Sequence, residues 1–142
     1  MVQAAATTTA IGRGYRFQVR GLPQPKGSAR AFLVHGKPVI TSTTRNLKQW
    51  EQLVRFQLQD FDGPPLEGPV CISLTFYLPR PKSAPRRVVH PATRPDLSKL
   101  VRSVEDALTG IVYRDDAQIM SLTAIKAFAT DFVGVAGRVW QQ

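Results

Sequence analysis

The chain has 142 residues, 43% of them hydrophobic and 20% charged, a balance that fits one compact domain and excludes fibrous or wholly disordered proteins. Its 19 lysines and arginines against 10 aspartates and glutamates give a formal charge of +9, which favours a polyanionic partner such as nucleic acid or an acidic membrane surface. Cys71 is the one cysteine and no apolar stretch nears the roughly 20 residues that span a bilayer, which excludes disulfide scaffolds, cysteine-based zinc sites and membrane-spanning proteins and indicates a reducing cytosol.

The amino-terminal part is expected to be a short lead-in followed by a strand. Residues 1–12 are small and rich in Thr and Ala, without the basic start and long apolar run of a signal peptide, so we expect a disordered lead-in. The folded domain is then expected to occupy residues 13–142. Tyr15, Phe17 and Val19 alternate with polar residues, which is the period of a half-buried strand.

A loop, a hairpin and a helix are expected next. Residues 21–30 contain two prolines and two glycines, which favour a loop. Residues 31–40 favour a strand or a hairpin, with residues 35–38 at its turn. Apolar residues then recur at three- and four-residue spacing, which predicts an amphipathic helix that begins after Thr43 or Thr44. The apolar residues of this helix are Leu47, Trp50, Val54, Leu58 and Phe61.

The second half of the chain is expected to add three strands and one helix. Clean alternation predicts a strand over residues 70–78. An apolar stripe over residues 97–108 predicts a second helix, and Gly110 closes it. Two strands are predicted to finish the chain, over residues 118–128 and 133–140.

Residues 79–95 stand out as a basic, proline-rich segment. Five prolines argue against regular secondary structure, and the high density of positive charge favours contact with phosphate. The basic residues are Arg80, Lys82, Arg86, Arg87, His90 and Arg94. The alternative interpretation is a solvated linker.

The spacing of acidic residues around the second helix suggests that two carboxylates meet. A helix from Asp96 to Gly110 is roughly 21 Å long, and six extended residues from Gly110 to Asp116 cover about 20 Å. If the chain reverses at Gly110 and runs back along the helix, Asp116 arrives beside Asp96 at the amino-terminal end of the helix. Strand alternation would point Asp115 and Asp116 to opposite faces.

Two carboxylates brought together in this way repel each other unless a cation lies between them. Mg²⁺ prefers one or two carboxylates, with water and phosphate oxygens completing its octahedron, so this would be metal-site chemistry. Ser98, Arg102, Glu105 and Asp106 fall on the polar side of the helix, where Arg102 could reach a phosphate held at the metal.

Ordinary structural roles remain open for all these residues. In these roles, Asp96 or Ser98 is simply a helix cap, and Arg102 and Glu105 belong to a solvated helix face. Asp115 and Asp116 then simply form a turn before a strand. Spacing alone does not decide between these roles and a metal site.

The segment from Arg94 to Gln118 resembles the signature of the RusA family of Holliday junction resolvases. That signature is a basic residue, Asp-x-Asp, a Lys or Arg one turn later, Asp-Ala-Leu, a glycine turn and Asp-Asp-x-Gln before a strand. The corresponding residues here are Arg94, Asp96, Arg102, Asp106-Ala107-Leu108, Gly110 and Asp115-Asp116-Ala117-Gln118. The early Pro25-Lys26-Gly27 with Arg30 also resembles a basic loop of phage members.

The resemblance implies roles for individual residues. Asp96 and Asp116, with Asp115, would belong to the acidic metal-binding cluster. Arg102 stands where the family usually has a catalytic lysine. Its planar guanidinium would bind one phosphate through two N–H groups but would not donate a proton. Ser98 replaces the second aspartate of the Asp-x-Asp pair. Its hydroxyl, or the charge of Asp115 or Asp106, would support the site instead.

The resemblance also implies an α+β fold with a mixed sheet and two helices packed against it. The implied activity is Mg²⁺-dependent hydrolysis of branched DNA such as four-way junctions, with Mn²⁺ as an alternative ion, in the cytosol of a bacterial or phage-infected cell. A homodimer would match the two-fold symmetry of a junction. Phosphate contacts are expected from Lys26, Arg30, Lys82, Arg86, Arg87, Arg94 and Lys99.

Two other functions stay open at this point. The first is a protein that binds branched DNA without cutting it, having kept the fold after losing an acidic ligand at Ser98. The second is an RNA-binding or membrane-surface domain in which the aspartates are structural. With a synthetic junction and Mg²⁺, cleavage supports the enzyme, binding without cutting supports the first alternative, and no preference for branched DNA supports the second.

Overall fold

The computed structural model describes residues 13–27, 30–41 and 45–142. The lead-in expected over residues 1–12 and the expected helix caps Thr43 and Thr44 lie outside this part. No helix within the described ranges has the length and hydropathy needed to cross a membrane.

A four-stranded sheet forms the centre of the fold, as the alternating patterns predict. Its strands lie in the order β1–β6–β4–β5. The strand β1 (Gly14–Arg20) pairs antiparallel with β6 (Gly134–Gln141), and β6 pairs antiparallel with β4 (Val70–Leu78). The edge strand β5 (Ile119–Phe128) runs parallel to β4, so the sheet is mixed.

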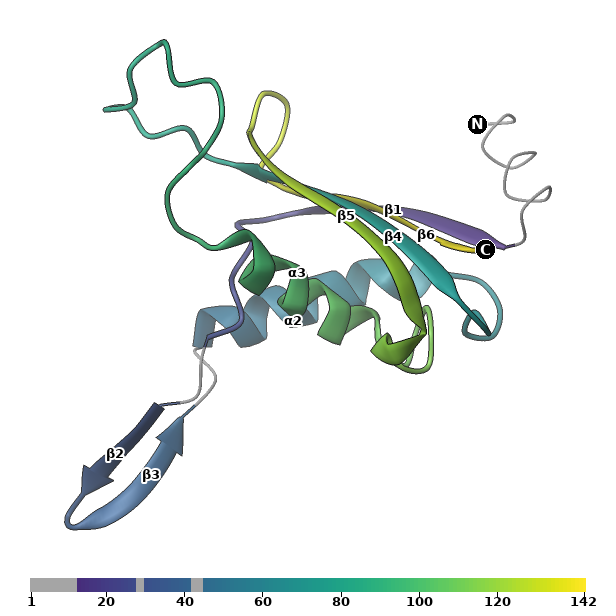
Figure 1. Ribbon diagram of the computed structural model, residues 1–142, viewed down its shortest axis with the longest axis horizontal. Helices are drawn as coiled ribbons and strands as arrows, with labels where there is room; N and C mark the ends of the chain where they lie inside the picture. The colour runs from purple at the N-terminus through teal and green to yellow at the C-terminus, as the bar shows by residue number, and fades with distance from the viewer. Residues whose placement is uncertain (1–12, 28–29, 42–44) are drawn as a thin grey trace.

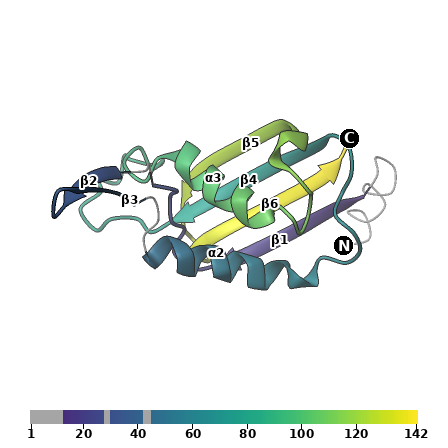
Figure 2. The same ribbon diagram turned by 90° about the horizontal axis from the view of Figure 1, so that it is seen from below.

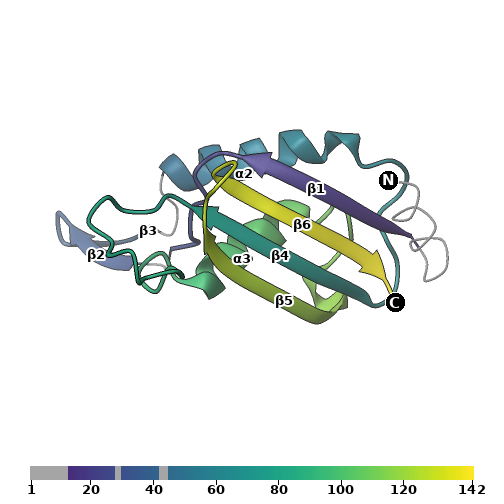
Figure 3. The ribbon, with the colours of Figure 1, turned by 90° about the horizontal axis from the view of Figure 1, so that it is seen from above.

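Two helices cover one face of this sheet, and both predicted helices are confirmed. The helix α2 (Arg45–Gln57) continues into a short 3₁₀ turn, and α3 (Leu97–Leu108) lies beside it (Figures 1 and 2). The α+β architecture with two helices on a mixed sheet is therefore confirmed. Figure 3 shows the other face of the sheet, over which no described helix or strand lies.

The core lies between the helices and the sheet. Helical residues three and four positions apart point to the same side, so each helix buries one apolar stripe against the alternate residues of the strands. Fully buried core side chains include Val54, Leu58, Leu66, Ile72, Leu74, Phe76, Leu100, Val104, Leu108 and Tyr113.

A separate hairpin extends away from the sheet (Figure 1). It consists of β2 (Arg30–Val34) and β3 (Lys37–Thr41), and the turn between them is only His35 and Gly36. Both turn residues have positive φ, 52° and 77°, as a tight two-residue hairpin turn requires. The expectation that residues 37 and 38 lie in the turn was therefore wrong.

The basic segment of residues 79–95 is folded around an arginine. The guanidinium of Arg80 donates to the carbonyl oxygens of Val88 and Pro85, both at 2.7 Å, and lies 4.9 Å from the centre of the Phe128 ring. Lys126 Nζ, from β5, donates to the carbonyl oxygens of Thr93 and Pro95 at 2.8 and 3.0 Å. Contacts at both ends make the segment a structured loop.

Candidate active site

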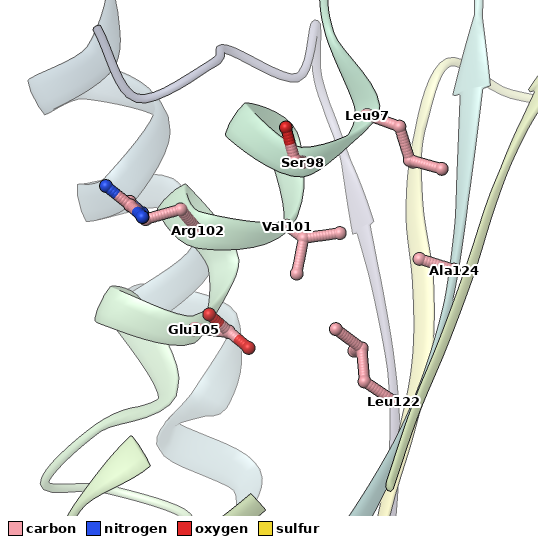
Figure 4. Close-up of a pocket in the computed structure, with 7 residues that line it drawn as sticks. All are labelled: Leu97, Ser98, Val101, Arg102, Glu105, Leu122 and Ala124. Atoms are coloured by element: carbon pink, nitrogen blue, oxygen red, sulfur yellow. The ribbon is translucent and has the colours of Figure 1, made fainter. Parts of the chain in front are cut away.

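A pocket of about 500 Å³ lies between α3 and the edge strand β5. Figure 4 shows its lining, which is Leu97, Ser98, Val101, Arg102, Glu105, Leu122 and Ala124. Ser98, Arg102 and Glu105 follow each other at spacings of four and three residues, so they form one polar stripe along α3. The pocket therefore has an apolar floor and a polar rim.

At the carboxyl-terminal end of this stripe, Glu105 lies near Asp116. Partial burial raises the pKa of the Glu105 carboxyl, the negative charges of Asp116 and Asp106 raise it further, and Arg102 opposes them. The Asp116 carboxylate is exposed, and no hydrogen bond or ion pair joins it to the described residues. The pair combines two hard oxygen donors next to a guanidinium.

The predicted meeting of Asp96 and Asp116 does not occur within the chain. The chain turns tightly after α3: the Gly110 N–H donates to Tyr113 O at 2.6 Å, and Asp116 then begins a 3₁₀ turn. The six residues are thus not extended, and the segment carrying Asp116 stays near the carboxyl-terminal end of α3 (Figures 1 and 2). Asp96 precedes the other end, about 13 Å along the helix axis from Glu105.

Asp115 has a structural role in the turn. Its carboxylate accepts a hydrogen bond from Ala117 N at 2.9 Å and caps the 3₁₀ turn Asp116–Gln118. Because residues 115 and 116 lie in a cap and a 3₁₀ turn, the predicted strand alternation of their side chains was wrong. One oxygen of the Asp115 carboxylate is therefore already hydrogen-bonded to a backbone N–H.

Gln118 fixes this turn to a distant loop. Its Oε1 accepts from Arg114 N and Asp115 N at 2.9 and 3.0 Å, and its Nε2 donates to Leu66 O and Gly68 O at 3.0 and 2.9 Å. All four hydrogen-bonding positions of the side-chain amide are used. The position of Asp116 is therefore set by Gln118, which the sequence analysis named as part of the family signature but gave no role.

The other end of α3 presents Asp96 and Ser98. Asp96 stands at the amino-terminal cap position, although its side chain makes no capping hydrogen bond, and its carboxylate lies 3.6 Å from Lys99 Nζ. Ser98 is exposed on the pocket rim. Lys126 holds the backbone just before Asp96, so the end of β5 and the start of α3 are joined.

Lys26 and Asp106 pair with each other. Lys26 Nζ lies 2.9 Å from the Asp106 carboxylate and 3.8 Å from that of Glu51, and its backbone N–H donates to Lys99 O. The hydrogen bond that Lys26 donates to the Asp106 carboxylate is the main reason that the pKa of Lys26 is raised. These contacts tie the residue 21–27 segment to both helices.

The remaining predicted phosphate contacts lie mainly in the basic loop. Lys82, Arg86, Arg87 and Arg94 are all exposed there, and no ion pair joins them to the described residues. Arg30 begins β2, and its side chain lies outside the described part. The loop thus presents four cations to solvent.

Within the described ranges, no three His, Cys, Asp or Glu residues come together in an arrangement that could hold a metal ion. Two carboxylates with water and phosphate oxygens can still bind Mg²⁺. The donor chemistry of Glu105 and Asp116 therefore fits a hard divalent cation.

Over most of its length the chain is similar to known proteins. The family model described as endodeoxyribonuclease RusA matches residues 23–136. An uncharacterized protein of Bacillus subtilis (strain 168), YqaN, is 29% identical over 128 residues, which cover 82% of this chain and 89% of YqaN. The matched region contains both helices, the basic loop and the whole of the Asp115–Gln118 turn.

Proposed function

Because the chain belongs to the RusA family of endodeoxyribonucleases, we propose that it cuts branched DNA, with four-way Holliday junctions as substrate and Mg²⁺ as the metal, for which Mn²⁺ can substitute. The observation that carries this proposal is that Glu105 and Arg102 line one pocket and that Asp116 lies near Glu105. Carboxylates next to a guanidinium suit phosphodiester hydrolysis, in which negative charge grows on the phosphate.

Each residue has a distinct task in this proposal. Asp116 and Glu105 would hold the metal, which would supply positive charge beside the phosphate and a more acidic water at this site. Arg102 binds the scissile phosphate through two N–H groups of its guanidinium. Asp96, which the family signature assigns to the same site, completes the acidic cluster.

We infer a dimer from the positions of Asp96 and Asp116. Oxygen ligands of Mg²⁺ lie about 2.1 Å from the ion, so Asp96 and Asp116 of one chain are too far apart to share it. Asp116 precedes Ile119 at the start of β5, whereas Asp96 lies near Lys126, seven residues or about 23 Å further along that strand. We therefore assign Asp96 and Asp116 of each site to different protomers.

The edge of β5 provides a surface for such a dimer. Among the described strands, β5 pairs only with β4, so its other edge is open. It also carries the exposed apolar side chains of Met120, Leu122 and Ile125, which are 58%, 45% and 54% exposed. Two copies of β5 paired antiparallel about a two-fold axis would place the start of one strand beside the end of the other.

This arrangement would bring Asp116 of one protomer toward Asp96 of its partner and create two equivalent sites. Two sites related by a two-fold axis fit the two strands that must be cut in a junction. The basic loop, with Lys82, Arg86 and Arg87, would hold the phosphates of the arms without reading their sequence.

One observation favours a second candidate function. Ser98 stands where the family signature has an aspartate, so the chain lacks one acidic group that catalysis in the family uses. A protein that binds junctions without cutting them is consistent with this replacement.

Incubation with a synthetic four-way junction, with and without Mg²⁺, tests the proposal. We expect paired nicks near the branch point that require the metal, and little cleavage of a linear duplex of the same sequence. Tight junction binding without cleavage in either Mg²⁺ or Mn²⁺ would support the non-catalytic function instead.

A further inference from the structure

The face of the sheet opposite the helices forms a second surface, which we call the open face. Phe17 and Val19 of β1 are buried toward the helices, so the alternate residues Arg16 and Arg20 point to the open face. The register places Arg138 of β6 directly opposite Arg16. Figure 3 shows this face of the sheet uncovered by the other described elements.

The open face is positively charged and carries no acidic residue on its strands. Arg16 and Arg138 are direct cross-strand neighbours, an arrangement in which two like charges repel. Among the described residues, no carboxylate pairs with Arg16, Arg20 or Arg138. The nearest strand positions on β4 and β5 are mainly Ser and Thr. A bound anion would relieve the repulsion that the protein itself leaves uncompensated.

Aromatic rings lie at both ends of the same face. The Arg138 guanidinium stacks 4.5 Å from the centre of the Trp140 ring at one end. At the other end, the Tyr77 and Phe132 ring centres are 5.1 Å apart, and Arg20 lies 5.2 Å from the Phe132 ring. Trp140 lies opposite Cys71, six residues from Tyr77 along β4, so the two ends are about 20 Å apart.

We propose that the open face binds single-stranded DNA. Arginines would contact the phosphates, and unpaired bases would stack on the ring of Trp140 and on the rings at Tyr77 and Phe132. A duplex keeps its bases stacked on each other, so it would use the arginines but not the rings. This surface lies on the opposite side of the sheet from the pocket between α3 and β5, and its function does not depend on cutting.

Tryptophan fluorescence reports on this face directly. The protein contains two tryptophans, and Trp50 is buried with 3% of its surface exposed. Adding oligothymidylate in the presence of chelator should therefore quench the fluorescence of Trp140 alone. Trp140→Phe should lose the quenching but keep binding, whereas Trp140→Ala should weaken binding of a fluorescein-labelled oligothymidylate about tenfold. Unchanged affinity of Trp140→Ala would overturn the proposal.

Charge variants give an independent test. The double variant Arg16→Gln with Arg138→Gln should lower the log–log salt slope for oligothymidylate by about 1.4, or 0.7 for each phosphate contact. The control, Lys48→Gln with Arg55→Gln on the exposed side of α2, removes the same charge and should leave the slope nearly unchanged.

Three results would contradict the proposal. An equal decrease of the salt slope in the sheet variant and in its α2 control would mean that only the net charge of the protein affects binding. An equal loss of affinity for duplex DNA in Trp140→Ala would mean that the rings do not select single strands. A change in sedimentation of the sheet variant without DNA, at unchanged affinity, would identify the open face as a contact between protein copies.

Discussion

Asp96 and Asp116 lie toward opposite ends of α3, although the sequence pattern predicts that they share one site. The tight turn closed by Gly110 and Tyr113 and the 3₁₀ turn at Asp116 keep Asp116 near Glu105. Asp96 is instead held near the carboxyl-terminal part of β5 through Lys126 and Pro95. Both aspartates can belong to one metal site only if two chains contribute to it.

Glu105 should make stability depend on pH when no metal is present. Burial, and then the charges of Asp116 and Asp106, raise the pKa of its carboxyl above 4.5 in the folded protein. As pH rises above that value, the unfolded chain loses the proton first, so the free energy of unfolding falls until the folded-state pKa is passed. Thermal unfolding in chelator should show this fall, and Glu105→Gln should reduce it.

Added Mg²⁺ should reverse the effect at neutral pH, because a cation favours the ionised carboxylates. The matched control is Glu67→Gln, which removes a glutamate whose side chain is 77% exposed. An identical pH profile for the parent and Glu105→Gln, with equal stabilisation by Mg²⁺, would remove Glu105 from the site.

Ser98→Asp should lower the Mg²⁺ concentration needed for half-maximal cutting. The substitution places a carboxylate on the pocket rim, two residues from Asp96. In chelator the added negative charge should lower the melting temperature, and Mg²⁺ should raise it more than in the parent. Titration of both properties with Mg²⁺ measures the effect. No change in either would mean that residue 98 does not face the metal.

Neutralising Lys82, Arg86 and Arg87 together should weaken junction binding and reduce its salt dependence. Each lost phosphate contact removes about 0.9 from the log–log slope on duplex DNA, so three contacts remove about 2.7. Fluorescence anisotropy across a salt series measures the slope. The loop should stay folded because Arg80, which organises it, is unchanged. If the variant has the same slope as the parent protein, DNA binds elsewhere on the protein.

Gln118→Ala should reduce both stability and cutting. It removes the four hydrogen bonds that hold the Asp116 turn against Leu66 and Gly68, and we expect a loss of about 1 to 2 kcal/mol in the free energy of unfolding. Urea denaturation measures it. Gln59→Ala, at an exposed glutamine, is the control and should be close to neutral. If Gln118→Ala cuts at the parental rate, the turn does not position a catalytic group.

Most elements of the fold could be predicted from local patterns. The alternation of β4 and the apolar stripe of α3 both reflect burial on one side of an element, which leaves a period in the sequence. The order of the strands could not be predicted, because β6 inserts between β1 and β4 through pairings of residues at least 57 positions apart.

The residue types of the candidate site could be predicted from the sequence, but the predicted geometry was wrong. The estimate of where Asp116 lies assumed an extended chain after Gly110, whereas local hydrogen bonds fold that segment into turns. The clamp by Gln118 depends on carbonyl groups about fifty residues earlier in the chain, which no local pattern indicates. Glu105 was expected only on a polar helix face, and its proximity to Asp116 follows from the same turn.

Mixing two inactive variants tests the shared site most directly. We expect Asp96→Asn and Asp116→Asn each to bind junctions but not to cut them, because each removes a metal ligand from both sites of a dimer. In a mixed dimer, one site would combine the intact Asp96 of one chain with the intact Asp116 of the other. Mixing the variants under conditions that allow subunit exchange should therefore restore Mg²⁺-dependent nicking, with one functional site per mixed dimer. A mixture that exchanges subunits, as shown by energy transfer between labelled chains, and still does not nick the junction would contradict the account.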